Sequence, residues 1–303
     1  MSKKTILSCL YHVLRYFCLL IMITITTRQE LKNHLSSLGK DISTGFVPTM
    51  GTLHQGHVSL LKRAQRENDL TVVSIFINPT QFNDPNDFKL YPRNYNDDAK
   101  KLELEGCDIL LLPSFEEVYP DSVVDWIEES FGSVEEVMEG RFRPGHFKGV
   151  KTVVYRLFQL VKPTRSYFGE KDYQQLRIIQ KLVKRYNLKI EIVPCPTERE
   201  PDGLAMSSRN KNLSKESRTN ASAIPEILKK ALLRLKSDSV ENVRAYVDKS
   251  FKMVEGLQLE YFEIANAETL LPVKGMAVPG NTRVFVAAYA GEVRLIDNIA
   301  FTD

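Results

Sequence analysis

The feature that most constrains the fold is an alternation between short apolar runs and amphipathic segments, which begins at residue 45. The short apolar runs predict strands at Gly45–Pro48, Leu70–Asn78, Asp108–Leu112, Ser166–Phe168 and Lys189–Val193. Apolar residues at helical spacing predict helices between them, at His57–Gln65, Val150–Val161 and Tyr173–Tyr186. Strands that alternate with helices of this length form β-α-β units with parallel, buried strands. The sequence therefore predicts an α/β fold with a Rossmann-like doubly wound parallel sheet.

This regular pattern ends after residue 195. The segment Pro194–Arg209 is rich in proline, glycine and serine, which is typical of a linker or a functional loop. Beyond it, Glu216–Leu235 and Val240–Val254 are predicted helices, and Leu257–Ala265 and Arg283–Tyr289 are predicted strands. We therefore expect a larger domain over residues 22–195 and a smaller α+β C-terminal lid domain over residues 196–303.

The amino terminus has a different character. A mostly apolar stretch from Thr5 to Ile25 follows two lysines, so a signal peptide or a membrane anchor is one interpretation. Against it, His12 and Arg15 interrupt the stretch, and no small-x-small cleavage site follows. Another interpretation is that Met22 is the true start. We favour a nonessential extension over residues 1–21.

Composition excludes several classes of partner. The chain has 41 Lys and Arg against 38 Asp and Glu, and this net charge of +3 is too small to indicate a nucleic-acid or membrane partner. The four cysteines, at positions 9, 18, 107 and 195, form no C-x-x-C pair. Reduced thiols in a reducing compartment are the simplest interpretation, so we expect a cytoplasmic protein.

The segment from Pro48 to His57 predicts an anion site. A strand ends at Pro48, a tight Met50-Gly51 turn follows, and a helix begins near His57. Helix amino termini favour anions, and open α/β sheets bind ligands at the carboxyl ends of their strands. His54 and His57 can place two imidazoles beside that anion, while glycine at 56 would let a ligand approach the backbone. Histidines that only cap a helix are the alternative interpretation.

The type of anion site is narrowed by two missing motifs. The sequence contains neither G-x-G-x-x-G nor G-x-x-x-x-G-K-[ST], which argues against a dinucleotide-binding fold and a P-loop kinase. The H-x-G-H motif fits adenylyl transfer better than either of these functions. In adenylyl transfer the reaction takes place at the α-phosphate of a nucleotide.

Three further clusters carry groups suited to phosphate. Gly169-Glu170-Lys171-Asp172 follows a predicted strand, and its lysine can neutralise phosphate charge. Met206–Asn210 offers two hydroxyls and a guanidinium, which can balance charge as pyrophosphate leaves. Arg141–Gly149 could close over phosphates as a basic flap. Each cluster alone has an ordinary alternative: a surface turn, a polar linker or a solvated loop.

Taken together, these clusters resemble in order and spacing the pantothenate synthetases (pantoate–β-alanine ligases), members of the HIGH-motif nucleotidyltransferase superfamily. The matching stretches are Val47–His57, Val73–Phe82, Tyr91–Arg93, Arg143–Gly149, Phe168–Gln175, Asp202–Asn210 and Arg294–Asn298. The resemblance covers the chain from residue 22 onward.

The resemblance implies a reaction: ATP-dependent condensation of (R)-pantoate with β-alanine to pantothenate, through pantoyl adenylate, with release of AMP and pyrophosphate. It also implies Mg²⁺, held mainly by ATP phosphates and water, so no protein ligands for the metal are predicted. A homodimer is implied as well, with no nucleic-acid or membrane partner.

The resemblance further implies the site residues. His57, His54 and Lys171 are the expected catalytic residues, with His57 as the usual proton donor. Gln81 and Gln175 match pantoate-binding residues; Gln81 should also lie near β-alanine, and Asn78 is a weaker candidate for that pocket. The expected ATP-binding residues are Met50, Gly51, Thr52, Leu53, His54, Gln55, Gly56, His57, Gly169, Glu170, Lys171, Asp172, Met206, Ser207, Ser208 and Arg209.

One position departs from the family pattern. Glu198 stands where an apolar residue usually packs near adenine.

Two other kinds of protein also remain as alternatives: a nucleotidyltransferase that adenylates a phosphate ester, and a noncatalytic nucleotide-binding regulator. Glutamines at 81 and 175 favour the ligase, since a phosphate acceptor would require Arg or Lys there.

Overall fold

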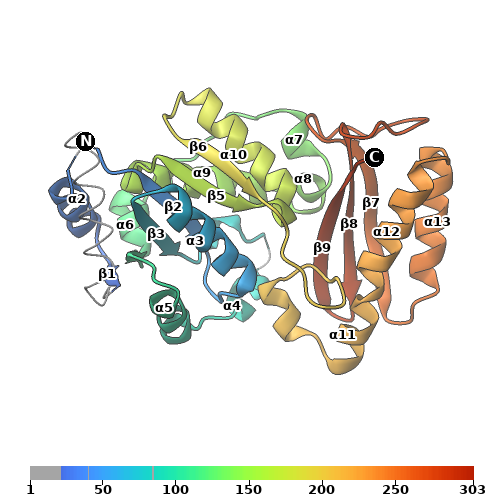
Figure 1. Cartoon of the computed structure of the whole chain (residues 1–303), viewed down its shortest axis with the longest axis horizontal. Helices are drawn as coiled ribbons and strands as arrows, with labels where there is room; N and C mark the ends of the chain where they lie inside the picture. Colours follow the sequence, from blue (N-terminus) through green and yellow to red (C-terminus); the bar gives the residue numbers. More distant parts are fainter. Residues whose placement is uncertain (1–21, 40, 84) are drawn as a thin grey trace, which may run out of the picture.

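The computed structural model describes residues 22–39, 41–83 and 85–303, and its larger part is a parallel sheet (Figure 1). Its strands are β1 (Ile23–Ile25), β2 (Thr44–Thr49), β3 (Leu70–Ile75), β4 (Ile109–Leu111), β5 (Arg165–Gly169) and β6 (Glu191–Cys195). They lie in the order β1-β4-β3-β2-β5-β6, and every neighbouring pair is parallel. The predicted parallel α/β sheet is confirmed.

The sheet begins with a strand that the sequence analysis did not predict. Ile23–Ile25, the last three residues of the apolar stretch, form β1 and pair with β4. Three residues at an edge are too short to stand out from the apolar residues before them. The predicted extension over residues 1–21 lies outside the described residues.

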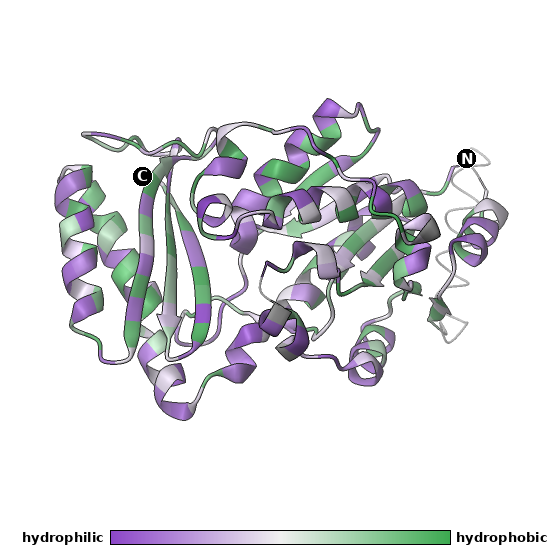
Figure 2. Ribbon diagram, turned by 180° about the vertical axis from the view of Figure 1, so that it is seen from behind, coloured by the Kyte–Doolittle hydropathy of each residue, from purple (hydrophilic) through white to green (hydrophobic). Residues whose placement is uncertain are grey.

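Helices cover both faces of the sheet, because side chains alternate along each strand. Val47 on β2 packs with α3 (Gln55–Glu67) and α5 (Tyr95–Leu104). Its neighbour Phe46 packs in the opposite core with α2 (Arg28–Ser37), α9 (His146–Val161) and α10 (Tyr173–Arg185). The helices show mixed hydrophilic and hydrophobic bands, as expected with one buried face (Figure 2). The doubly wound arrangement is therefore confirmed.

The carboxyl-terminal region contains a second, antiparallel sheet. It consists of β7 (Leu257–Asn266), β8 (Thr282–Ala290) and β9 (Val293–Phe301), and α12 (Ala223–Leu235) and α13 (Val240–Lys252) pack against it. Residues on its other face, such as Phe285 and Tyr261, join the core of the larger region. The smaller α+β region is confirmed, whereas the domain boundary between residues 195 and 196 stays a prediction.

Two details of this region differ from the sequence prediction. The segment Glu216–Leu235 is two helices, α11 (Lys215–Ala221) and α12, because the ring of Pro225 cannot lie in the middle of one continuous helix. β9 was not predicted; it follows β8 through a tight turn at Gly291, whose φ is +58°.

The remaining elements are short. They are η1 (Pro79–Gln81), α4 (Pro85–Leu90), α6 (Phe115–Val118), η2 (Pro120–Ser122), α7 (Ser133–Glu136), α8 (Glu139–Phe142), η3 (Glu170–Asp172) and η4 (Ser208–Asn212). Among the described residues, no helix is long and apolar enough to cross a membrane.

The strand order predicts where a ligand binds. The chain leaves β2 through α3 on one face and leaves the adjacent β5 through α10 on the other. The two loops therefore diverge at the carboxyl ends of β2 and β5, and such a switch point opens a crevice in α/β sheets.

Candidate active site

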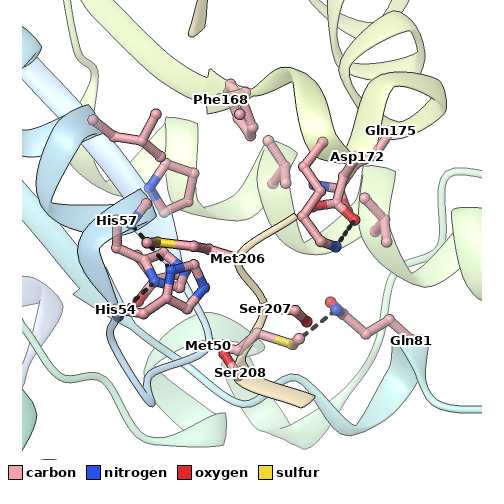
Figure 3. A pocket seen from close by; sticks show the side chains of 18 of the residues that line it. Met50, His54, His57, Gln81, Phe168, Asp172, Gln175, Met206, Ser207 and Ser208 are labelled. Atoms are coloured by element: carbon pink, nitrogen blue, oxygen red, sulfur yellow. Dashed lines mark hydrogen bonds and ion pairs between the residues drawn. The ribbon is translucent and has the colours of Figure 1, made fainter. Parts of the chain in front are cut away.

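A pocket of about 240 Å³ lies at this switch point (Figure 3). The loops after β2 and β5 form two of its walls, α9 forms an apolar wall, and the segment after β6 closes it. The predicted residues that line it are Met50, His54, Gly56, His57, Gln81, Gly169, Lys171, Asp172, Gln175, Met206, Ser207, Ser208 and Arg209. The structure therefore brings together parts of all the clusters that the sequence singled out.

The two histidines cap α3 and also face the pocket. His54 is the residue that begins the helix, and its Nδ1 accepts a hydrogen bond from the Gly56 N–H at 3.1 Å. His57 Nδ1 accepts in turn from the His54 N–H at 3.3 Å, and the two rings lie 4.1 Å apart. Because each Nδ1 accepts a hydrogen bond, each proton lies on Nε2. Capping and function are thus compatible interpretations of H-x-G-H.

Burial and nearby positive charge keep both imidazoles neutral. Desolvation, with a smaller effect of Lys171, lowers the pKa of His54 to about 4. Desolvation, His54 and Lys171 lower the pKa of His57 well below its usual value. Two neutral rings with Nε2–H groups are hydrogen-bond donors, which suits binding of phosphate oxygens.

Gly56 is required for a reason that the sequence did not reveal. A Cβ at this position would lie 2.9 Å from Cε1 and Nδ1 of His54. The absent side chain therefore makes room for the imidazole that caps the helix, in addition to lining the pocket.

The loop after β5 is held from the carboxyl-terminal sheet. Asn298 on β9 donates to the backbone carbonyls of Glu170 and Lys171 at 2.9 and 2.8 Å. Arg283 on β8 donates to the Glu170 carboxylate at 2.7 Å. Lys171 is thereby presented to the pocket with Asp172, whose carboxylate lies 3.6 Å from its ammonium group. Glu170 supports the loop and does not line the pocket.

Two of the three glutamines near the site, Gln81 and Gln175, line the pocket, whereas the third, Gln174, holds neighbouring backbone in place. Gln174 is buried and bonds to the backbone of Val134, Val137 and Glu139, whereas Gln175 lines the pocket. Gln81 also lines it, and its amide donates to the sulfur of Met50 at 2.9 Å (Figure 3).

Asn78, the weaker candidate, lies behind Gln81. It is 1% exposed, and its amide nitrogen donates to Gln81 Oε1 at 3.2 Å. Its oxygen accepts from the hydroxyl groups of Thr80 and Tyr119. Asn78 therefore orients Gln81 and does not itself line the pocket.

The predicted basic flap is mostly helical. α8 and the first turn of α9 include most of Arg141–Gly149, so this segment is not a free loop. Of its three cations, only Arg143 lines the pocket. Arg141 lies over the Phe142 ring, and Lys148 pairs with Glu128 at 2.7 Å.

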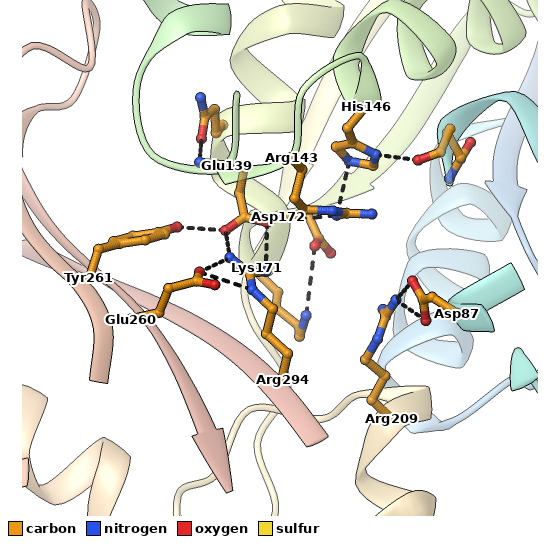
Figure 4. Close-up of polar contacts among 12 residues, drawn as sticks. Asp87, Glu139, Arg143, His146, Lys171, Asp172, Arg209, Glu260, Tyr261 and Arg294 are labelled. Carbon is orange, nitrogen blue, oxygen red and sulfur yellow. Dashed lines mark hydrogen bonds and ion pairs between the residues drawn. The ribbon is translucent and has the colours of Figure 1, made fainter. Parts of the chain in front are cut away.

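Arg143 and His146 form a chain of contacts (Figure 4), which ends on the backbone of Gln81. His146 Nδ1 lies 2.8 Å from the Gln81 carbonyl oxygen and so donates to it, while Nε2 accepts from Arg143 at 3.2 Å. Arg143 also lies 3.6 Å from the Glu139 carboxylate. Desolvation lowers the pKa of His146 to about 3, so this imidazole is neutral too.

Glu139 connects this chain to the second sheet. It is 6% exposed and accepts two hydrogen bonds from Arg294 on β9 and one from Tyr261 on β7. Burial alone would raise the pKa of Glu139, but the bonds and charge of Arg294 outweigh burial and lower the pKa to about 2.

The Met206–Arg209 segment closes the pocket from the carboxyl-terminal side. Ser208 Oγ donates to the Thr52 carbonyl at 3.2 Å, and Arg209 pairs with Asp87 on α4 at 2.8 Å (Figure 4). Glu198 also lines the pocket; its side chain is exposed, and its carbonyl oxygen accepts from the Met206 N–H at 3.0 Å. The glutamate that replaces the family's usual apolar residue at position 198 therefore does not prevent the backbone hydrogen bond between residues 198 and 206.

Five predicted ATP residues do not line the pocket: Gly51, Thr52, Leu53, Gln55 and Glu170. Sequence reasoning also missed several lining residues, among them Phe76, Phe82, Tyr91 and the α9 residues Val150, Val153, Val154 and Leu157. The helical spacing of apolar residues in α9 was visible in the sequence. The sequence did not show which of these residues face the pocket.

The pocket offers few protein groups that could bind a metal ion, which fits an ion held mainly by the phosphates of a bound nucleotide. Two carboxylates, Asp172 and Glu198, line the pocket. Within residues 22–39, 41–83 and 85–303, no group of three or more His, Cys, Asp and Glu side chains could hold a metal ion. The described cysteines, Cys107 and Cys195, are buried free thiols.

Comparison with known proteins points to one family. Residues 23–300 match the family model described as "Pantoate-beta-alanine ligase". The chain is 45% identical over 279 residues to the pantothenate synthetase of Pseudothermotoga lettingae, which covers 91% of this chain and 98% of that protein. It is 46% identical to the pantothenate synthetase of Bacteroides fragilis over 285 residues, 93% of this chain and all of that protein.

Solved structures agree with this result. The pantothenate synthetase of Thermus thermophilus matches with a TM-score of 0.87 at 41% identity, covering 93% of this chain and 100% of that one. The pantoate-beta-alanine ligase of Francisella tularensis, complexed with beta-gamma ATP and beta-alanine, matches with a TM-score of 0.78 at 40% identity, covering 92% and 98%. Since the family model, the relatives and the fold agree over nearly the whole described chain, the protein belongs to the pantoate-beta-alanine ligase family.

Proposed function

We propose that this protein uses ATP to condense (R)-pantoate with β-alanine, giving pantothenate, AMP and pyrophosphate through a pantoyl-adenylate intermediate. The observation that carries the proposal is the convergence of His54, His57 and Lys171 with Gln81 and Gln175 in one switch-point pocket. Three phosphate-binding groups and two neutral amides suit a nucleotide beside a small hydroxy acid. The Francisella relative supports the choice of ligands, since its structure holds an ATP compound and beta-alanine.

In the first step, a carboxylate oxygen of pantoate attacks the α-phosphorus of ATP, and the bond to the bridging oxygen breaks. The Nε2–H groups of His54 and His57 donate to phosphate oxygens, and Lys171 offsets the charge that develops on departing pyrophosphate. Because both histidines are neutral, hydrogen bonding by His57 explains its role better than transfer of a full proton.

In the second step, the amine of β-alanine attacks the acyl carbon and AMP leaves. No enzyme nucleophile takes part, so the chain has to position substrates and exclude water. Gln81 and Gln175 bind pantoate, and the apolar α9 wall suits its two methyl groups. Arg143, which lies beside the Gln81 region, supplies positive charge for a substrate carboxylate.

The rest of the ATP site comes from both regions of the chain. Gly169 and Asp172 lie where the ribose would bind, and Met206–Arg209 would close on the triphosphate. Arg209 would exchange its Asp87 partner for phosphate on closure. Bound Mg²⁺, carried mainly by ATP phosphates with Asp172 within the same pocket, would neutralise phosphate charge. We also propose the lid domain over residues 196–303 and a homodimer.

The decisive experiment measures the products of ATP cleavage. AMP and pyrophosphate should form only when pantoate is present, and pantothenate should appear when β-alanine is added. His57→Ala should lower the rate of adenylate formation by about 10²–10³-fold, as expected when one transition-state donor is lost. Lys62→Ala, on the exposed side of the same helix, is the control and should keep the wild-type rate.

Two results would contradict the proposal. Formation of ADP, or cleavage that is indifferent to pantoate, would exclude an adenylating ligase. An unchanged rate in folded His57→Ala would exclude the role assigned to that imidazole.

A further inference from the structure

A buried carboxylate outside the pocket wall holds the loop that leads into the histidines. Asp98 on α5 is 3% exposed, and its two oxygens accept from the N–H groups of Thr52 at 2.6 Å and Leu53 at 2.7 Å. Two successive N–H groups that converge on one anion form a nest, a backbone arrangement that binds phosphates in many proteins. In this chain the anion in the nest is the protein's own side chain.

The loop conformation depends on such a contact. Gly51 has φ +84° and Thr52 has φ +53°. A β-branched residue rarely adopts a positive φ, so Thr52 keeps this conformation only where its surroundings impose it. The Thr52 hydroxyl donates to the Pro92 carbonyl at 2.8 Å, and the Asp98 carboxylate holds the N–H groups on either side of the Thr52 carbonyl.

All the backbone polar groups of the nest are already engaged. Lys101, one turn beyond Asp98 on α5, donates to the Leu53 carbonyl at 2.6 Å. Ser208 donates to the Thr52 carbonyl, and Asp98 accepts from both N–H groups. Because these donors are occupied and Thr52 and Leu53 are buried, a ligand phosphate has no group to bind there.

We propose that Asp98 is a positioning residue: it replaces a ligand anion in the Thr52–Leu53 nest and thereby directs the ATP phosphates to His54, His57 and Lys171. The nest immediately precedes His54, so its geometry sets where the cap of α3 and both imidazoles lie. Without the carboxylate, two unpartnered N–H groups would draw a phosphate away from the reacting position and free the loop from its left-handed conformation. This inference rests on the proposed ATP site.

Asp98→Ala and Asp98→Asn test the proposal in the full-length chain. Both should lower kcat for pantoate-dependent pyrophosphate release by about 100-fold, the size expected when reacting groups are misplaced by about an ångström. The amide of Asn keeps the shape but brings a donor against two donors, so it should not restore the rate. Added formate should restore kcat of Asp98→Ala in a saturable manner, whereas neutral formamide should not.

Asp108→Ala is the matched control. Asp108 is 8% exposed and also accepts two hydrogen bonds, from the N–H and hydroxyl groups of Thr71 at 2.8 and 2.7 Å, but Thr71 lies on β3 and not in the loop before His54. Its removal should lower the thermal midpoint without a formate-dependent change in kcat. Wild-type turnover, measured alongside, tests the proposed reaction separately from the role of Asp98.

Two results would overturn the proposal. One is a folded Asp98→Ala variant with wild-type kcat and KM for ATP, and the other is a folded but slow variant that formate does not restore. If the variants do not fold, amide hydrogen exchange of the wild-type chain decides. The Thr52 and Leu53 amides should already be strongly protected without ATP, because Asp98 accepts from both. Fast exchange of these two amides in the ATP-free chain would show that Asp98 does not occupy the nest.

Discussion

His54 and His57 combine two roles that sequence reasoning treats as alternatives. Each ring accepts a backbone N–H at the start of α3, and each also faces the pocket. A side chain that caps a helix is held in one rotamer and one tautomer. The capping contacts therefore hold two Nε2–H donors in place for the phosphate contacts proposed above, so that little side-chain freedom would be lost when ATP binds.

The buried neutral histidines predict how stability depends on pH. His146 has a pKa of about 3 in the folded chain against an ordinary value of 6.5, so below pH 6.5 the unfolded chain binds more protons than the folded one. The free energy of unfolding should therefore fall as the pH is lowered from 6.5 toward 4, by about 1.4 kcal/mol per pH unit for each such histidine. Urea unfolding at successive pH values measures this slope.

The variant His146→Gln is the comparison for that measurement. Glutamine can still donate and accept but does not titrate, so the slope between pH 6.5 and 4 should become shallower. Equal slopes for the wild type and the variant would show that His146 contributes nothing to the pH dependence.

At the scale of elements, the position of Gln81 depends on how closely η1 packs against α9. Gly149 on α9 lies against the η1 backbone, and a Cβ there would lie 2.3 Å from the Thr80 carbonyl oxygen and 2.7 Å from Gln81 Cα. These are backbone atoms, so the contact cannot be relieved by turning a side chain. The helix therefore needs glycine at this point for Gln81 to reach the pocket.

Gly149→Ala should consequently push η1 away from α9. We expect a loss of about 1–3 kcal/mol in the free energy of unfolding, as for other overpacked sites, together with a raised KM for pantoate. Steady-state kinetics with varied pantoate and urea unfolding measure the two effects.

Gly45→Ala on β2 serves as the control for this substitution. Its added Cβ would lie 2.6 Å from the Asn68 side chain, and neither Gly45 nor Asn68 lines the pocket. It should lower stability and leave the KM for pantoate unchanged. A normal KM in Gly149→Ala would mean that η1 accommodates the methyl group without moving Gln81.

At the scale of the whole molecule, the two sheets are joined by buried charge next to the pocket. Arg294 on β9 pairs with Glu139 at 2.7 Å, and their side chains are 19% and 8% exposed (Figure 4). Arg283 joins β8 to the Glu170 loop in the same way. Both ion pairs end on segments that support lining residues, so the smaller sheet helps to position the site.

Removing one partner of the buried pair should be costly. Arg294→Met leaves the Glu139 carboxylate buried beside Tyr261 without its main partner, and we expect a loss of about 3–5 kcal/mol in the free energy of unfolding. The double variant with Glu139→Gln removes the unpaired charge and should recover part of that loss. Urea unfolding of the two single variants and the double variant measures the coupling.

Arg244→Met is the control, because it breaks a more exposed ion pair than Arg294–Glu139. Arg244 and Glu263 lie 2.7 Å apart with side chains 31% and 28% exposed, so their separation should cost less than about 1 kcal/mol. If Arg294→Met costs no more than Arg244→Met, the Arg294–Glu139 pair does not hold the two sheets together.

Much of this organisation is encoded locally. The apolar periods at Gly45–Pro48 and Tyr173–Tyr186 predicted β2 and α10 within two residues, because the period of buried side chains follows from the geometry of strands and helices. Motifs with fixed spacing, such as H-x-G-H and Gly169–Asp172, predicted residues that the structure brings to one pocket. β1 and β9 were missed, since short or terminal strands differ little in pattern from the loops beside them.

By itself, then, the sequence determined five of the six parallel strands, the helices α3, α9 and α10 between them, and the ends of the strands at which a ligand is expected. Only the tertiary structure decided which of the predicted residues face the pocket: His54 but not Leu53, and Lys171 but not Glu170. It also decided that Asp98 fills the loop nest and that Arg294 reaches Glu139. These contacts join residues 46 and 155 positions apart, so no local period or spacing encodes them.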